Sequence, residues 1–96
     1  MYRDDPLDDE AELIALLGEE PVARLREAGQ TTGRDVLGAA LDVLRVLQGW
    51  VSDEAAARWF GSAQRRLDDR SPVEALSDGD VEDVEDAGRA WAAAHG

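Results

Sequence analysis

The sequence predicts an all-α protein, a compact bundle of about five to six helices with a long central helix. After the N-terminal tail, every segment that shows a hydrophobic period shows the helical one. Capping residues and glycines divide the chain into segments of helical length. Because 96 residues suffice for one core, the predicted segments 1–30, 31–51 and 52–96 should form one folding unit.

The first segment is predicted to be an acidic helical hairpin. Asp8 or Asp9 is the expected N-cap of its first helix, and Gly18 the end of that helix. A second, short helix has Pro21 in its first turn and Gly29 at its C′ position.

The longest helix is expected from Thr31 or Thr32 to Val51. Two adjoining apolar stripes run along it, one with Leu37, Ala40, Leu41, Leu44 and Leu47 and the other with Val36, Val43, Val46 and Trp50. So wide an apolar surface must be covered from two sides. We therefore expect the central helix of the fold here, and the sequence leaves open a homodimer through it.

The next helix is expected to begin after the N-cap Ser52 and to end at Gly61, with Trp59 and Phe60 in the core. The stretch SAQRRLDDR shows no period, and we interpret it as a loop with Leu67 as its anchor.

Two more helices are predicted after this loop. Ser71, Pro72 and Glu74 form a capping box with proline at N1, and Leu76 is the buried residue of that short helix. The stretch SDGD breaks the chain, and Asp80 is the expected cap of the last helix.

The last helix is predicted to be amphipathic. Its apolar stripe holds Val81, Val84, Gly88, Trp91, Ala92 and His95, and its outer face holds Glu82, Asp83, Glu85 and Asp86. Glycine inside a helix costs about 1 kcal/mol relative to alanine, so we expect another helix to approach Gly88 closely.

The charge pattern restricts the class of partner. The net charge is −12, with acids concentrated in residues 1–20 and 71–96. This field repels phosphate backbones and favours basic partners, although in a salt-adapted organism it would serve solvation alone. With no cysteine, no membrane-spanning run and no basic leader, the sequence favours a cytoplasmic protein that does not enter a membrane.

The sequence offers little for catalysis. His95 is its only imidazole and lies next to the C-terminus, where fraying opposes fixed geometry. The run DGDVEDVED faintly resembles a calcium loop, but it lacks glycine at the sixth position and glutamate at the twelfth. We expect no catalytic residue, metal site or cofactor, and we interpret the chain as a helical binding module.

The one basic concentration allows two interpretations. Arg58, Arg65, Arg66 and Arg70 either pair within the molecule with Asp53, Asp68 and Asp69, or present forked donors to a partner. The second interpretation is slightly favoured.

Residues 54–94 resemble the C-terminal toxin-binding domain of the Xre/MbcA/ParS antitoxins. The matching positions are Trp59, Phe60, Leu67, Arg70, Ser71, Pro72, Leu76, Gly79 and Asp80. Two departures stand out. The family's Gly-Gly is replaced by Asp68-Asp69, and only AGQTTGRD separates the second and third helices. This leaves no room for the family's recognition helix, so the DNA-reading half is degenerate or lost.

The resemblance implies a type II antitoxin that binds a RES-domain toxin, an enzyme that destroys NAD, and blocks the entrance of its active site. A pocket that binds pyrophosphate should be basic, which suits an acidic terminal helix. The expected toxin-binding residues are Arg65, Arg66, Arg70, Asp80, Glu82, Asp83, Asp86, Trp91 and His95. Trp59, Phe60, Leu67, Ser71, Pro72, Leu76 and Gly79 are expected to hold that surface in shape.

Two other functions remain open at this point. One is a DNA-binding regulator that represses its own operon through a reduced helix-turn-helix. The other is an acidic nucleic-acid mimic or an orphan without its toxin, which would explain the charge but not the Arg-Ser-Pro and Gly-Asp motifs.

Overall fold

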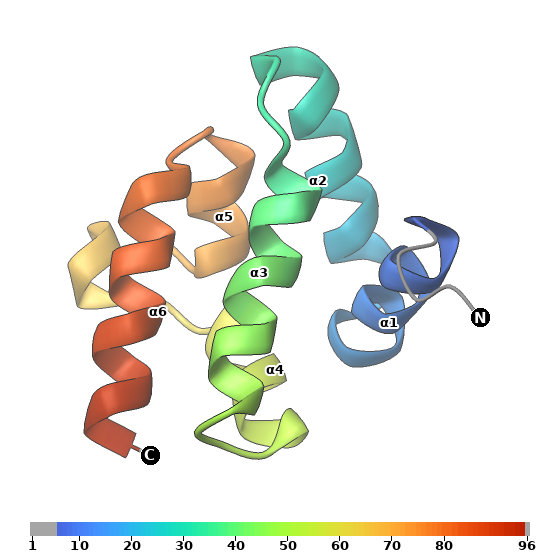
Figure 1. The fold of residues 1–96 in the computed structure, drawn as a ribbon. Coiled ribbons are helices and arrows are strands. Elements are labelled where there is room, and N and C mark those ends of the chain that lie inside the picture. Colours follow the sequence, from blue (N-terminus) through green and yellow to red (C-terminus); the bar gives the residue numbers. More distant parts are fainter. Residues whose placement is uncertain (1–5, 96) are drawn as a thin grey trace.

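A computed structural model describes residues 6–95 of the chain, and the side chains of residues 10–95. The described part consists of α1 (Pro6–Leu17), α2 (Glu19–Thr32), α3 (Val36–Gln48), α4 (Asp53–Phe60), the 3-10 turn η1 (Arg65–Leu67), α5 (Pro72–Ser77) and α6 (Val81–His95) (Figure 1). This confirms the predicted all-α bundle of five to six helices. The first five residues of the predicted segment 1–30 lie outside the described part.

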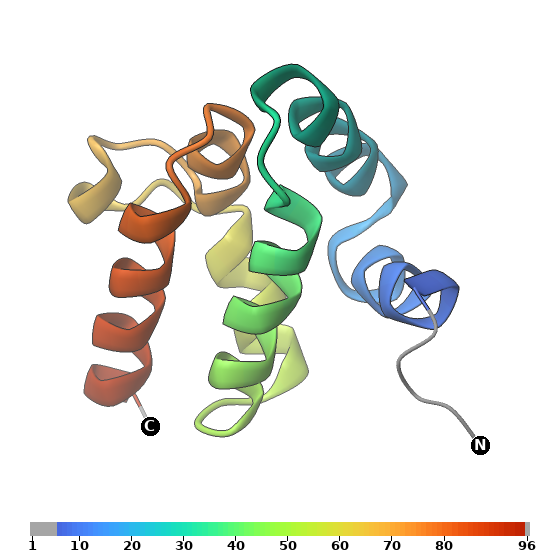
Figure 2. The ribbon, with the colours of Figure 1, turned by 45° about the horizontal axis from the view of Figure 1, so that its top comes forward.

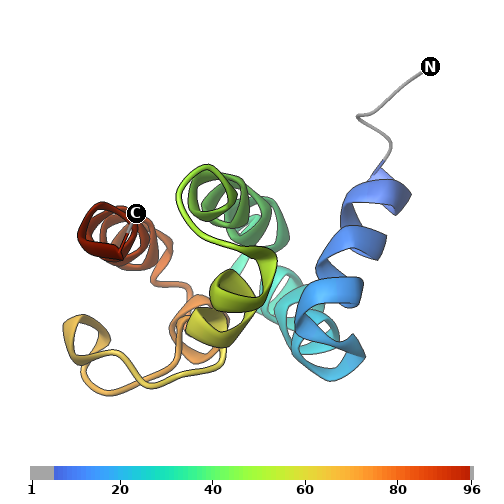
Figure 3. The same cartoon turned by 90° about the horizontal axis from the view of Figure 1, so that it is seen from below.

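Helix α3 occupies the centre of the bundle. It lies between α6 on one side and the α1–α2 pair on the other, as the view from below shows (Figure 3). Its buried residues are Val36, Ala39, Ala40, Val43, Leu44 and Leu47. The central position is therefore confirmed, and burial on two sides accounts for the wide apolar surface of this segment.

The predicted length of α3 was wrong. It spans 13 residues, from Val36 to Gln48, whereas α2 spans 14 and α6 spans 15. Asp35 is its N-cap, and one carboxylate oxygen of Asp35 accepts a hydrogen bond from the amide of Gly38 at 2.9 Å. This local cap, rather than Thr31 or Thr32, begins the helix.

The boundary between α2 and α3 was also wrong, because α2 continues through Gly29 to Thr32. Its C-cap is Gly33, which has a left-handed conformation with φ 74° and donates its amide to the carbonyl of Gly29. The hydroxyl of Thr32 donates a hydrogen bond to the carbonyl of Ala28, four residues earlier, at 2.7 Å. This bond is compatible with a helical conformation at Thr32. Glycine at position 33, not at 29, provides the positive φ that ends the helix.

The start of α1 differs as well. The helix begins at Pro6, so Asp8 and Asp9 lie within its first turn instead of preceding it. Proline fits that position because its ring presets a helical φ. The N–H group that it lacks would have no partner in the first turn of a helix. Gly18 ends α1 as predicted, with a positive φ of 99° and its amide donating to the carbonyl of Ile14.

Helices α4 and α5 begin as predicted. The Ser52 hydroxyl accepts from the amide of Ala55, and Gly61 follows the last residue of α4. At α5, Ser71 and Glu74 form a complete capping box and Pro72 opens the helix. Figure 2 shows short α5 beside the start of α6, with the chain between α4 and α5 looping outside α6.

The second stripe predicted on α3 is buried only in part. Val36 and Val43 are in the core, but Val46 is 37% exposed and Trp50, just past the end of α3, is 56% exposed. The bundle thus leaves these two apolar side chains exposed towards the end of α3. None of the helices in residues 6–95 combines the length and apolarity needed to cross a bilayer.

Candidate functional site

The apolar motif residues that carry the family resemblance are buried, whereas Arg70, Gly79 and Asp80 are only partly buried. Trp59 is 3% exposed and Phe60 is fully buried, with their rings in edge contact at 5.2 Å between centroids. From η1, Leu67 is buried as the predicted anchor of the loop. Pro72 and Leu76 of α5 are buried beside them. Helices α4 and α5 pack against each other, and Leu67 of η1, which packs on α6, joins the same buried core.

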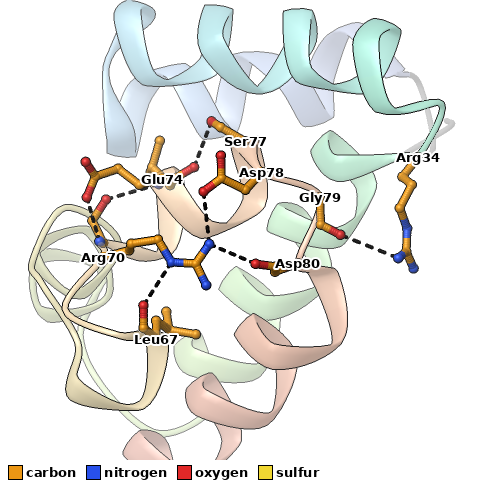
Figure 4. A network of polar contacts seen from close by, with 10 residues as sticks. Arg34, Leu67, Arg70, Glu74, Ser77, Asp78, Gly79 and Asp80 are labelled. Carbon is orange, nitrogen blue, oxygen red and sulfur yellow. Dashed lines mark hydrogen bonds and ion pairs between the residues drawn. The ribbon is translucent and has the colours of Figure 1, made fainter.

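Arg70 ties this segment to the turn between α5 and α6 (Figure 4). Its Nε donates to the carbonyl of Leu67 at 2.9 Å, while Nη1 donates to Asp78 at 2.9 Å and to Asp80 at 2.8 Å. The hydrogen bond to Asp80 contributes most, and the one to Asp78 next, to a raised pKa of the Arg70 guanidinium. Arg70 and Asp80, both predicted to contact the partner, thus bind each other.

A second arginine reaches the same turn from the opposite side. Arg34, in the connection between α2 and α3, donates to the carbonyl of Gly79 at 3.4 Å and pairs with Glu82 of α6. The hydrogen bond and charge of Glu82 raise the pKa of Arg34, and the hydrogen bond from Arg34 lowers the pKa of Glu82. Gly79 has φ 86°, which glycine adopts without strain. The turn is therefore held from two sides.

Most of the other predicted toxin-binding residues meet at a groove between η1 and α6. Its volume is about 270 Å³, and it is lined by Gln64, Arg65, Arg66, Ala87, Ala90, Trp91, Ala94 and His95. Four of the nine predicted toxin-binding residues line it: Arg65, Arg66, Trp91 and His95. Within residues 10–95, neither Arg65 nor Arg66 makes an ion pair through its side chain.

An aromatic column connects this groove to the core. The buried Trp59 stacks on the half-buried Trp91 at 5.9 Å between centroids, and Trp91 stacks on the exposed His95 at 4.8 Å. His95 Nδ1 lies 2.9 Å from the carbonyl of Trp91, one turn back along α6. The last turn of α6 is thus held by the ring stack as well as by its backbone.

The two other acidic site residues lie outside the groove on the same helix. Asp83 and Asp86 are exposed, and Asp86 pairs with Arg89 at 3.5 Å. Helical spacing places Asp83 in line with Ala87, Ala90 and Ala94, which line the groove. The exposed face of α6 therefore carries acid at its N-terminal end and small apolar residues towards its C-terminus.

The Asp68-Asp69 pair has the backbone conformation that suits glycine. Both residues have positive φ, 58° and 64°, at the end of η1. Aspartate tolerates this left-handed region better than most residues, because its short polar side chain can bond locally. The chain then returns to a single antiparallel bridge between Gln64 and Arg70.

Sequence reasoning missed several residues of this region. The sequence left open whether Arg70 pairs within the molecule with Asp53, Asp68 and Asp69 or serves a partner, and the structure pairs it instead with Asp78 and Asp80. Arg34 received no role, because its contact with Glu82 spans 48 positions in sequence. The only indication of the groove floor, Ala87, Ala90 and Ala94, in the sequence is the high alanine content of the last helical segment.

Comparisons were made with models of protein families, with curated proteins and with solved structures. None of the three finds a protein or family that matches this chain. The geometry described above is therefore the basis for assigning a function.

Proposed function

We propose that this chain is the antitoxin of a type II toxin–antitoxin pair and that it occludes the active site of a RES-domain toxin that degrades NAD. One observation carries the proposal. The apolar motif residues of the resemblance are all buried, and side chains between and beside the motif residues line one groove. A buried core of this kind presents a surface of fixed shape, as partner recognition requires.

The backbone of the loop adds support. Where the antitoxin family has Gly-Gly, Asp68 and Asp69 both adopt positive φ. The replacement therefore keeps a backbone path that glycine would also follow. The acids Asp83 and Asp86 remain exposed on α6, where they can approach a basic pocket.

The DNA-binding alternative gains no comparable support. Around α2 and α3, Arg26 pairs with Glu10 and Arg34 pairs with Glu82. These pairs reduce the positive charge available to phosphates. A DNA-reading role would need a basic stripe, and the net charge of −12 opposes one.

The test uses two alanines of the last turn of α6. Ala93 and Ala94 are both exposed, but only Ala94 lines the groove. Ala94→Arg should fill the groove and abolish neutralisation, whereas Ala93→Arg makes the same chemical change beside it and should protect like the wild type. Truncating the last ten residues is less suitable, because it would remove the buried Ala87, Gly88 and Ala92.

The measurement is co-expression with the product of the adjacent reading frame, which we expect to be a RES-domain toxin. Growth rescue, co-purification and inhibition of NAD hydrolysis are scored for the wild type and both variants. Rescue by the wild type and Ala93→Arg, with loss in Ala94→Arg, supports the proposal. Equal protection by all three proteins removes the groove from the mechanism, and a neighbour that neither arrests growth nor binds removes the antitoxin function.

A further inference from the structure

We infer that the groove between η1 and α6 binds an acidic helical segment of the partner protein, with its carboxylates on Arg65 and Arg66 and its small apolar side chains on the alanines of α6. This deepens the proposed function and rests on it for the partner's identity. The chemistry of the groove can be tested without the toxin.

The arginines are the first argument. The chain has 22 acidic residues and ten basic ones, and Asp68 and Asp69 follow Arg65 and Arg66 almost directly. Even so, both guanidinium groups stay exposed and without an ion pair in the described part of the chain. Two forked donors on one wall of a groove are complementary to carboxylates, and arginine pairs with these in bidentate fashion.

The floor of the groove is the second argument. Ala87, Ala90 and Ala94 lie at i, i+3 and i+7 along α6 and so share one face of the helix. Ala87 is buried, Ala90 is half-buried and Ala94 is exposed, so the floor opens towards the last turn. A face of small side chains lets another backbone approach closely, and helix-in-groove recognition uses this arrangement.

The aromatic column argues against a nucleotide in the same place. Nucleotides are held by stacking on an open ring, but Trp91 already stacks on both Trp59 and His95. A protein segment that needs only a shallow channel and two carboxylate contacts fits better.

The experiment titrates the ¹⁵N-labelled protein with a capped alanine-rich peptide that carries pairs of Glu at i, i+4 spacing. The control peptide has Gln at every Glu position. We expect amide shifts at Ala90 and Ala94 and an indole N–H shift at Trp91 with the Glu peptide, and none with the Gln peptide. The Arg65→Glu/Arg66→Glu variant should weaken binding by roughly tenfold or more, which corresponds to about 1.4 kcal/mol or more.

A matched control variant is Arg24→Glu/Arg58→Glu. Both of these arginines are exposed and lie outside the groove lining, so the net charge changes equally while the groove stays intact. This variant should bind the Glu peptide far more tightly than the groove variant does. The inference would be overturned if millimolar Glu peptide shifted no resonance of the groove residues. It would also be overturned if the two variants weakened binding of the peptide equally. Shifts of the same residues by ADP that exceed those by the peptide would overturn it as well.

The two proposals fail separately. If the Glu peptide shifts the groove resonances but the protein does not bind the toxin, the groove assignment stands and the antitoxin function is rejected. Toxin neutralisation that survives Arg65→Glu/Arg66→Glu, in a protein without peptide shifts, rejects the groove assignment and keeps the antitoxin function. Circular dichroism of each variant confirms that the helices are intact before either conclusion is drawn.

Discussion

At the residue scale, Gly88 shows how one small side chain sets a helix contact. A Cβ atom built at Gly88 would lie 2.9 Å from Val43 Cγ1 and 3.4 Å from Trp59 Cη2. Val43 cannot easily move aside, because it is buried and its β-branched side chain has few rotamers in a helix. The prediction that another helix approaches Gly88 closely is confirmed, and that helix is α3.

Gly88→Ala should therefore lower the free energy of unfolding by about 1 kcal/mol. The gain in helix propensity of about 1 kcal/mol is exceeded by an overpacking cost of about 1–3 kcal/mol. Urea denaturation measures the difference. In a Val43→Ala background, the same substitution has room and should become stabilising. An identical effect in both backgrounds would show that the Val43 contact is unimportant.

Residues whose role is local were predictable, and those with distant partners were not. Ser52, Ser71 and Glu74 bond to backbone within three positions, so the sequence pattern alone identified them. The partner of Arg34 lies 48 positions away in sequence, and those of Arg70 lie 8 and 10 positions away, beyond α5. No spacing rule in the sequence indicates which of many acids an arginine will meet.

At the scale of elements, helix type was predictable and helix ends were not. Gly29 and Gly33 both resemble C-caps in sequence, yet only Gly33 takes a positive φ. A Cβ at Gly29 would lie 3.3 Å from the carbonyl oxygen of Arg34, so this glycine serves the close return of the chain after α2. The path of the chain directly after α2, which returns to Gly29 within five residues, therefore distinguishes the two glycines.

The capping box of α5 should make stability depend on pH. The carboxylate of Glu74 accepts from the amide of Ser71 at 2.8 Å, and this bond, followed by that to the Ser71 side chain, lowers the pKa of Glu74 from its ordinary 4.5. Because the folded state favours the ionised form, the stabilisation is complete above pH 4.5 and is lost as the pH falls through the lowered value.

We therefore expect Glu74→Gln to be less stable than the wild type at pH 7, with a difference that shrinks as the pH is taken below 4.5. Thermal denaturation across this range measures it. Glu54→Gln at the start of α4 is the control, since Glu54 is also exposed in a first turn but lacks a capping bond among the described side chains. A difference that stays constant with pH would contradict this account.

At the scale of the whole molecule, charge and shape come from different parts of the sequence. The net charge of −12 follows directly from the composition, while the groove arises where η1 packs against α6, with α5 between them in sequence. Val46 and Trp50 are both exposed near the end of α3, the helix through which the sequence left a homodimer open. The helical period placed both residues on an apolar stripe, but it could not show whether that stripe is buried or exposed.

The charge predicts the response of the protein to salt. Self-repulsion among the acids should be screened as NaCl rises from about 10 mM to about 150 mM, where the Debye length falls from ~30 Å to ~8 Å. We expect stabilisation on the order of 1 kcal/mol, or about 4–8 °C in Tm. Calorimetry at several salt concentrations measures it.

A Glu19→Gln/Glu20→Gln variant provides the control for this effect. Both residues are exposed in the first turn of α2, so their removal lowers the charge without disturbing the core. Its Tm should rise less with salt than that of the wild type. A fall in Tm with salt would mean that exposed ion pairs outweigh the repulsion, contrary to their usual small contribution.

The arrangement of the three tryptophans has an optical consequence. Trp50 is exposed, Trp59 is buried and Trp91 stands at the groove in contact with His95, so each indole has a different environment. Replacing the exposed Trp50 by Phe would leave fluorescence from the column alone. Any segment that enters the groove must then change the emission of Trp91, and the protein reports its own occupancy without an attached dye.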